Sequence, residues 1–312
     1  MPALKGNKEK YVNGVKVDKE NDDVIYNDEK HLYLSKKDNS KYISVTTLIH
    51  EYTNPFNESF WASYKACEWI LGPEGFKPLK KILLQSKLWK DEYLDTYNID
   101  KKLFESKRNE IIQSYANKRD EACLRGTAIH GKMEELFYQQ DKNIIAKYSG
   151  GGEFDVKKGY YKLDVDRVIL PEFLISYEFD KYLKISGQID LLIKDGLDII
   201  VTDWKTNGKI DKDSYFDQST KKRQMMKFPL ENLPDCNFYH YSLQLSLYAY
   251  MLQQINPKFR IKKLMIVHFD HNGGETEYEV EYLKEDVARM LLHYRKQQKI
   301  KSELAKDKPI VF

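Results

Sequence analysis

The feature that most constrains the fold is a fixed order of apolar periods in the second half of the chain. Three strand-like runs rich in Ile, Leu and Val precede one long apolar helical run, and two more strand-like runs follow it. The strands are expected at residues 167–179, 182–193, 197–206, 262–270 and 275–283, and the helix at 238–255. This order is typical of one α/β domain, here with an N-terminal helical extension.

The first 123 residues have a different pattern. Residues 1–22 are polar and rich in Lys, which predicts a flexible arm. Residues 24–47 hold short β-like runs split by a turn-rich KKDNS, which predicts a hairpin. Residues 57–123 have helical spacing, and a charged helix is expected near 284–306. We therefore expect an arm at 1–22, a hairpin and helical subdomain at 23–123, and an α/β core with a C-terminal helix at 124–312.

Composition narrows the functional classes. Among 312 residues, 51 Lys and Arg against 48 Asp and Glu give a net charge of +3. This balance excludes a histone-like polycation and an acidic disordered chain, but it allows nucleic-acid binding by a local basic segment. Three scattered cysteines are too few for a disulfide framework and indicate a reducing compartment. Without a signal-peptide pattern or a run of ~20 apolar residues, we expect a cytoplasmic protein with no membrane partner.

Two carboxylates and an ammonium interrupt the second and third predicted strands. Because side chains alternate along a strand, Asp203 and Lys205 share one face. The turn between the strands permits two registers, in which Asp190 lies opposite either Asp203 or Val201, and both bring the three charges together. Like charges side by side in an apolar sheet need a compensating cation, and carboxylate ligands favour Mg²⁺ or Mn²⁺. The structural alternative is an exposed strand edge with an ordinary salt bridge.

Two helical motifs offer further polar groups. Gly126, His130 and Glu134 recur every four residues and therefore share a helix face, so the imidazole can complete a metal site. Gln244 and Tyr248 are also one turn apart and can hold a phosphate or a backbone turn. The structural alternatives are a histidine satisfied at a helix–sheet contact and a core helix with a packed tyrosine.

The motifs GxxxHxxxE, GxID, DxK and QxxxY, in this order, resemble the RecB-type branch of the PD-(D/E)XK nucleases over residues 120–270. That branch includes the nuclease domains of RecB and AddAB, the RecB-like CRISPR-associated nucleases, the mitochondrial genome maintenance exonuclease and many phage exonucleases. The resemblance implies a restriction-endonuclease-like core, with a central mixed sheet flanked by helices, and a Mg²⁺- or Mn²⁺-dependent deoxyribonuclease. It also implies products with 5′-phosphate and 3′-hydroxyl ends.

The resemblance assigns roles to the motif residues. His130, Asp190 and Asp203 would ligate the metal, with the carbonyl of Trp204 as an additional ligand. Lys205 would orient or help deprotonate the attacking water and stabilise charge on the phosphate. The expected catalytic residues are therefore Asp190, Asp203 and Lys205.

Supporting roles also follow from the resemblance. Gln244 and Tyr248 would support the site and touch the DNA backbone. An acidic residue on the preceding strand often joins such sites, and Glu172 is the first choice as a ligand, with Glu178 second. Cys123 lies near the first motif, but no cysteine cluster follows the last one, so we expect no iron–sulfur cluster.

A local basic excess at 205–227, with seven basic against three acidic residues, predicts contacts with DNA phosphates. The alternative is a solvated loop. The candidate DNA-binding residues in this segment are Lys209, Lys221, Lys222 and Arg223.

The expected function is a metal-dependent DNA exonuclease acting on DNA ends or single strands in recombination, replication or DNA processing. The resemblance includes phage-encoded members, for which the compartment would be the host cytoplasm. The chain carries no Walker A motif, so a helicase, recombinase or single-strand-binding protein would be a separate partner. Two alternatives remain, namely a structure-specific or restriction-like endonuclease and a non-catalytic nucleic-acid-binding protein on a nuclease fold.

Overall fold

The computed structural model describes residues 10–12, 15–158, 161–218 and 220–306. The chain forms two compact units, which we call the core unit and the helical unit. The core unit comprises Met1–Thr53, Ile129–Ser214 and Met225–Phe312, and the helical unit comprises Asn54–Ala128 and Tyr215–Gln224. Helix α4 (Lys101–Tyr138) contributes residues to both units.

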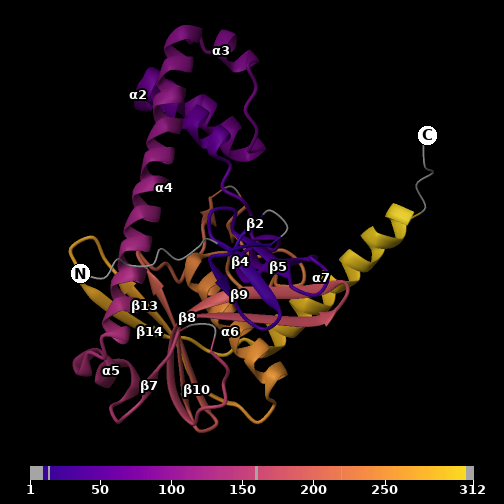
Figure 1. Ribbon diagram of the computed structural model, residues 1–312. Helices are drawn as coiled ribbons and strands as arrows, with labels where there is room; N and C mark the ends of the chain where they lie inside the picture. Colours follow the sequence, from indigo (N-terminus) through magenta and orange to yellow (C-terminus); the bar gives the residue numbers. More distant parts are fainter. Residues whose placement is uncertain (1–9, 13–14, 159–160, 219, 307–312) are drawn as a thin grey trace. The chain divides into compact units, whose positions relative to one another are not determined.

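The core unit is built on a mixed sheet with the strand order β14-β13-β10-β9-β6-β5-β4-β3, and β8 and β7 extend it from β9 (Figure 1). Consecutive strands β8, β9 and β10 are antiparallel, whereas β13 lies parallel to β10. The strand bounds are β3 Lys19–Glu20, β4 Val24–Asn27, β5 Leu32–Ser35, β6 Lys41–Ser44, β7 Asp155–Val156, β8 Arg167–Asp180, β9 Leu183–Asp195, β10 Asp198–Lys205, β13 Arg260–Phe269 and β14 Glu275–Glu279. The predicted α/β class and its strands are confirmed.

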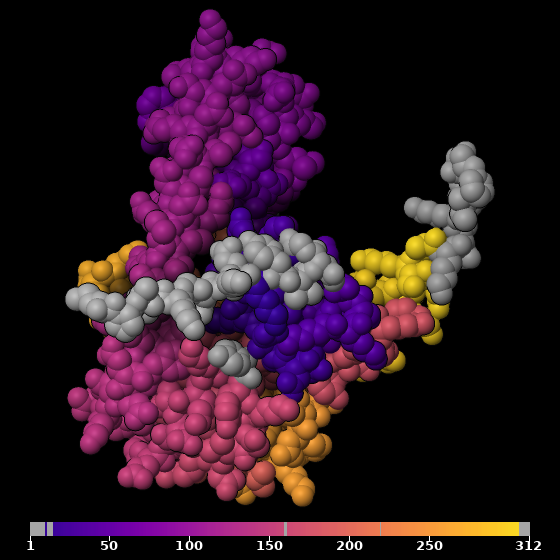
Figure 2. All heavy atoms as spheres, viewed as in Figure 1, coloured from indigo at the N-terminus to yellow at the C-terminus, as the bar shows by residue number. Residues whose placement is uncertain are grey.

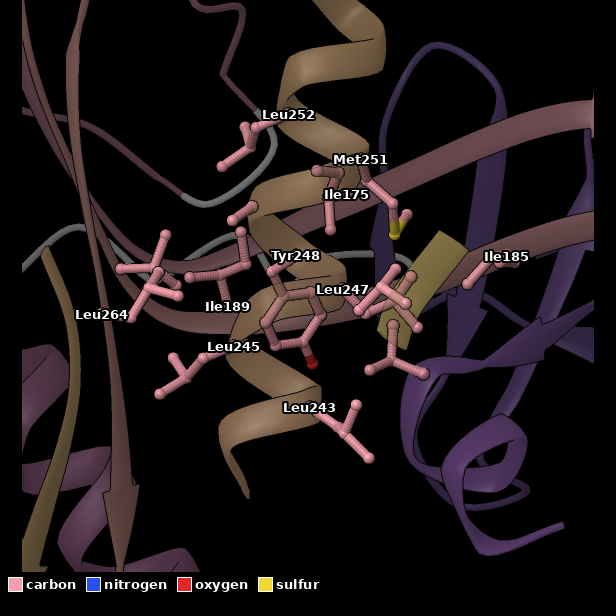
Figure 3. Close-up of a cluster of buried hydrophobic side chains, with 14 of the residues drawn as sticks. Ile175, Ile185, Ile189, Leu243, Leu245, Leu247, Tyr248, Met251, Leu252 and Leu264 are labelled. Atoms are coloured by element: carbon pink, nitrogen blue, oxygen red, sulfur yellow. The ribbon is translucent and has the colours of Figure 1, made fainter. Parts of the chain in front are cut away.

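Helices cover both faces of this sheet. On one face lie α1 (Val45–His50), α6 (Asn237–Ile255) and α7 (Lys284–Lys306), whose apolar side chains form the main cluster with β8, β9, β10 and β13. Figure 3 shows the leucines of α6 and Tyr248 within this cluster. On the other face, the end of α4 and α5 (Lys142–Ser149) pack on Ile169, Leu191 and Trp204. A sheet flanked by helices in this way fits a restriction-endonuclease-like core.

The N-terminal strands belong to the core unit rather than to a separate subdomain. The predicted hairpin across KKDNS forms as antiparallel β5 and β6, and its first run divides further into antiparallel β4 and β5. Strand β6 also pairs in parallel with β9. Within the arm predicted at 1–22, residues 1–9 and 13–14 lie outside the described residues, but β1 (Tyr11–Val12) pairs with β2 (Val15–Lys16) and β3 pairs with β4. The described part of this segment therefore forms short strands through backbone pairing, which its polar composition does not predict.

The helical unit contains α2 (Glu58–Ser86), α3 (Glu92–Thr96) and most of α4, together with the short strands β11 (Phe216–Asp217) and β12 (Lys222–Arg223). Helix α2 kinks at Gly72, whose φ of 68° suits glycine, and Pro73 follows at the start of the next helical segment. The predicted boundary between residues 123 and 124 falls inside α4, because the helical pattern continues without a break into the core unit. None of the helices in the described ranges is long and apolar enough to span a bilayer.

Candidate metal centre

The polar site of the core unit lies where the pairing partner along one edge of β9 changes from β6 to β10. Along one edge, β9 pairs with β10 through residues 191–195 and with β6 through residues 185–186. The two partner strands diverge around residues 187–190, and the GxID motif occupies this stretch. Because the ladder is interrupted at the divergence, backbone groups there can form hydrogen bonds with side chains instead of with a neighbouring strand.

The β9–β10 hairpin has the first of the two registers considered. Asp195 pairs with Asp198 and Leu191 pairs with Thr202, so Asp190 falls opposite Asp203. The backbone N–H of Trp204 donates to Asp190 Oδ2 at 2.7 Å, which takes the place of a ladder bond. Both carboxylates are buried, and Asp203 is only 1% exposed. The two acidic groups therefore lie within the fold rather than at an exposed strand edge.

Glu172 on β8 joins these carboxylates through a local irregularity. The β8–β9 pairing places Pro171 opposite Leu191 and Phe173 opposite Ile189, so Glu172 faces Asp190. Glu172 has a φ of 51°, which is uncommon for a residue other than glycine within a strand. The alternation of β8 changes phase there, because the side chains in the main cluster have even numbers before Glu172 and odd numbers after it: Val168, Leu170, Phe173 and Ile175.

His130 completes a three-residue group with Glu172 and Asp190. Its Nδ1 lies 3.2 Å from Glu172 Oε1 and 3.6 Å from Asp190 Oδ1, and its Nε2 lies 3.2 Å from the carbonyl oxygen of Trp204. One ligand atom from each of the three side chains lies within 4.8 Å of the others. Glu178, the second choice, instead forms an ion pair with Lys184 at 3.2 Å. Of the two candidate acids, Glu172 is the one that lies in the group.

Buried Asp203 forms an ion pair with the partly buried Lys205 beside this group. Lys205 Nζ lies 2.6 Å from Asp203 Oδ2, and Gln244 Nε2 donates to Asp203 Oδ1 at 2.9 Å. Lys205 Nζ also lies 4.6 Å from the centre of the Tyr241 ring. Tyr241 was not among the predicted site residues, although its position one turn before Gln244 on the same face of α6 could have indicated it.

Tyr248 supports the site through the backbone of β9. The ring of Tyr248 is buried, and a Cβ added to Gly187 would lie 2.8 Å from Tyr248 Cε1 and 3.1 Å from Val45 Cγ2. Residue 187 therefore has no room for a side chain, which gives the glycine of GxID a physical reason. Gln244 and Tyr248 both lie inside the protein, Gln244 as a support of Asp203, so their predicted contact with the DNA backbone stays a prediction.

Burial and close charges shift the pKa values of the site. Burial and the carboxylate of Asp203 raise the pKa of Asp190 well above its ordinary value. Burial opposes a charge on His130, but the carboxylates of Asp190 and Glu172 outweigh it and raise the pKa of His130 to about 9. Burial likewise opposes the charge on Lys205, yet Asp203 and Asp190 raise its pKa to about 12. Without a metal, burial thus favours the protonated form of Asp190, and the close carboxylates favour the protonated forms of His130 and Lys205.

The donor set fits a divalent cation. Two carboxylates and an imidazole converge on one point, and the backbone carbonyl of Trp204 faces the same imidazole. Asp203 Oδ2 is buried and accepts no well-aligned hydrogen bond, although the Lys205 ammonium is close. Oxygen donors with one imidazole are a ligand set that Mg²⁺ and especially Mn²⁺ accept. The His130, Glu172 and Asp190 group can therefore bind a metal, and Asp203 lies beside it with contacts to Gln244 and Lys205.

The basic residues predicted to bind DNA are distributed over both units. Lys209 belongs to the core unit, where it is exposed and pairs with Asp211 at 2.7 Å. Lys221, Lys222 and Arg223 belong to the helical unit, at the exposed β11–β12 turn and strand. Their contacts with phosphates stay a prediction.

The comparisons with known proteins leave the site as the main basis for a function. No family model and no curated protein matches this sequence. A solved structure named SSO0001 is 15% identical, with a TM-score of 0.31 over 75% of this chain and 89% of the other. One named "putative exonuclease", from Eubacterium rectale, is 14% identical, with a TM-score of 0.30 over 82% of each chain. Because both TM-scores are low, the predicted membership of the PD-(D/E)XK nucleases stays a prediction.

Proposed function

We propose that the core unit is a metal-dependent deoxyribonuclease of the RecB-like kind, which hydrolyses phosphodiester bonds at DNA ends or in single strands. The observation that supports this most is the juxtaposition of the His130, Glu172 and Asp190 group with the Asp203–Lys205 ion pair. Three carboxylates, one imidazole and one ammonium in a single buried site are costly to fold without a ligand. Their arrangement suits a cation together with a phosphate.

The proposed metal ligands are His130, Glu172, Asp190 and Asp203, and the proposed metal is Mg²⁺ or Mn²⁺. When bound, such an ion lowers the pKa of a water molecule and offsets charge on the scissile phosphate. Asp203 would reach the ion through Oδ2, the oxygen that lacks a well-aligned hydrogen bond. Gln244 holds the other oxygen of Asp203 and so fixes the direction of the carboxylate.

Lys205 is the proposed catalytic cation. Asp203 and the Tyr241 ring hold its ammonium in place, and its pKa near 12 keeps it charged. In the reaction, the oxygen of water bonds to phosphorus, the bond to the 3′-oxygen breaks, and the leaving oxygen takes up a proton. A fixed ammonium stabilises the negative charge that grows on the phosphoryl oxygens during this substitution.

The test is the cleavage of end-labelled linear DNA and of closed circular DNA, single-stranded and duplex, with Mg²⁺, Mn²⁺ or EDTA. We expect linear DNA to be shortened only with a metal, and we expect both Asp190→Asn and Lys205→Met to remove the activity. The matched controls are Asp195→Asn, an exposed carboxylate on the same strand, and Lys262→Met, an exposed lysine on β13.

The outcomes separate the alternatives. Circles cut as fast as linear strands would establish an endonuclease instead of an exonuclease. Binding of DNA without cleavage under any metal would favour the non-catalytic binding protein. Full activity of the Asp190→Asn protein would contradict the proposed site.

A further inference from the structure

A second lysine, from the N-terminal strands, contacts the His130, Glu172 and Asp190 group. Lys19 lies on β3, and its Nζ is 3.6 Å from Glu172 Oε2, the oxygen that faces away from His130. The Lys19 side chain is 30% exposed, whereas that of Glu172 is 11% exposed. The ammonium of Lys19 thus contacts the buried cluster, and part of the Lys19 side chain is exposed to solvent.

The position of Lys19 is fixed by the strands around it. Lys19 pairs with Tyr26 on β4, and the Tyr26 ring stacks on Tyr33 at 4.6 Å. Two residues after Lys19, the side chain of Asn21 donates to Ser176 Oγ on β8 at 3.0 Å. Figure 2 shows the N-terminal strands, in blue-violet, against the pink surface of β8 and β9. The paired strands therefore position the backbone of Lys19 near Glu172. The contact does not depend only on the conformation of the flexible lysine side chain.

The charges of the site show what a second cation would do. Glu172, Asp190 and Asp203 carry three negative charges when ionised, and Lys205 carries one positive charge. A divalent ion adds two positive charges, and a metal-bound imidazole is neutral. Without Lys19, the loaded site would therefore have no net charge. With Lys19, its net charge is about +1, which equals and opposes the charge of one phosphodiester.

We propose that Lys19 is a phosphate-binding residue of this site, which matches the metal-loaded cluster to the single negative charge of an internal phosphodiester. This inference rests on the proposed nuclease function. Lys19 also holds Glu172 by its outer oxygen, as does Gln188, so Glu172 Oε1 is left to face the metal. Because its charge opposes that of a cation, Lys19 weakens metal binding while it strengthens binding of the substrate.

The experiment compares Lys19→Met, Lys19→Arg and the wild type, with Lys30→Met as the control. Lys30 is an exposed lysine of the turn between β4 and β5. The first measurement is the Kd of Mn²⁺ by calorimetry without nucleic acid. The second is the Kd of a fluorescent eight-residue oligothymidylate with Ca²⁺ in place of Mn²⁺, at several salt concentrations. Neither measurement depends on turnover.

We expect Lys19→Met to bind Mn²⁺ at least threefold more tightly and the oligothymidylate roughly tenfold more weakly, a change of about 1.4 kcal/mol. The slope of log Kd against log salt concentration should fall by about 0.7, the value for one phosphate contact on a single strand. Lys19→Arg should retain both affinities of the wild type, and Lys30→Met should change neither. These opposite shifts in affinity distinguish phosphate binding from a purely structural ion pair. Loss of a structural ion pair would weaken the binding of both Mn²⁺ and the oligothymidylate.

Two results would overturn the inference. One is a Lys19→Met protein that binds the oligothymidylate with the wild-type affinity and salt slope. The other is a Lys19→Met protein that loses affinity for Mn²⁺ and for the oligothymidylate together. A wild-type protein that binds Mn²⁺ but neither binds nor cleaves any nucleic acid would instead refute the proposed function, and the inference with it.

Discussion

Asp190→Asn should stabilise the metal-free protein while it removes metal binding. Asp190 is buried opposite Asp203 and beside Glu172, and its pKa is raised because its ionised form is poorly solvated and repelled by Asp203. Asparagine has nearly the same shape, and its carbonyl oxygen can still accept the hydrogen bond from Trp204 N. The substitution therefore removes the unfavourable charge and keeps the packing.

The sign of the effect follows from proton binding. An unfolded aspartate loses its proton near pH 4, whereas folded Asp190 keeps its proton to a higher pH. Within the window in which only the folded state holds this proton, the free energy of unfolding falls by about 1.4 kcal/mol for each pH unit. The amide does not titrate, so the stability advantage of the variant should be near zero at pH 4 and should increase toward pH 7.

The magnitude is limited by the favourable contacts that Asp190 makes. The carboxylate lies 3.6 Å from His130 Nδ1, and loss of this attraction offsets part of the gain. Replacing a buried ion pair by neutral side chains of similar volume is often neutral or stabilises a protein by about 1–4 kcal/mol. We expect a gain of about 1–3 kcal/mol at pH 7, and a melting temperature higher by roughly 2–10 °C for a unit of this size.

The assay is thermal unfolding at pH 4, 5.5 and 7, with EDTA or with saturating Mn²⁺. Mn²⁺ at about 100 times its Kd should stabilise the wild type by about 2.7 kcal/mol and should leave Asp190→Asn unchanged. Asp195→Asn, at an exposed ion pair with Arg167, is the control and should shift stability by less than about 1 kcal/mol. The reasoning is refuted if Asp190→Asn melts at or below the wild-type temperature in EDTA at pH 7, or if Mn²⁺ stabilises it.

Three further predictions concern residues around the same carboxylate. Since protons occupy His130 up to about pH 9 in the metal-free protein, the Kd of Mn²⁺ measured by calorimetry should fall as the pH rises from 7 to 9, and His130→Ala should lose this dependence. Gly187→Ala should destabilise the protein by about 1–3 kcal/mol in urea unfolding, and Tyr248→Leu should relieve most of that cost by removing the clash. Glu172→Gln should weaken Mn²⁺ binding at least tenfold by calorimetry, whereas Glu178→Gln should leave it unchanged.

The sequence predicted the parts of the site that depend on local periodicity. Apolar alternation and the Asp195–Gly196 turn region limited the β9–β10 hairpin to two registers, and both joined Asp190 to Asp203. The spacing of Gln244 and Tyr248 predicted one face of α6, which lies against the sheet. Short-range patterns suffice here because the periodicity of a strand or helix alone determines which of its side chains share a face.

Contacts between distant segments were not predictable in this way. Nothing in the polar run around Lys19 indicates that it lies beside Glu172, because that contact depends on β6 pairing with β9 across about 140 residues of sequence. The left-handed conformation of Glu172 was also missed, since a plain alternating pattern assumes one phase along the whole of β8. Both features arise from tertiary pairing, which propensity and periodicity do not encode.

The divergence of β10 and β6 from β9 explains why charged residues are tolerated at this point of an apolar sheet. In a continuous ladder, the N–H of Trp204 would pair with a strand carbonyl, but here it donates to the carboxylate of Asp190. The strand end thus supplies a hydrogen bond that an aliphatic side chain at position 190 would leave unmade, at a cost of about 1–3 kcal/mol. The carboxylates of Asp190, Asp203 and Glu172 gather at this opening, and His130, Lys205 and Lys19 are the cationic side chains beside them. A gap in backbone pairing is therefore what allows a polar cluster with the donor set for a cation to lie inside the fold.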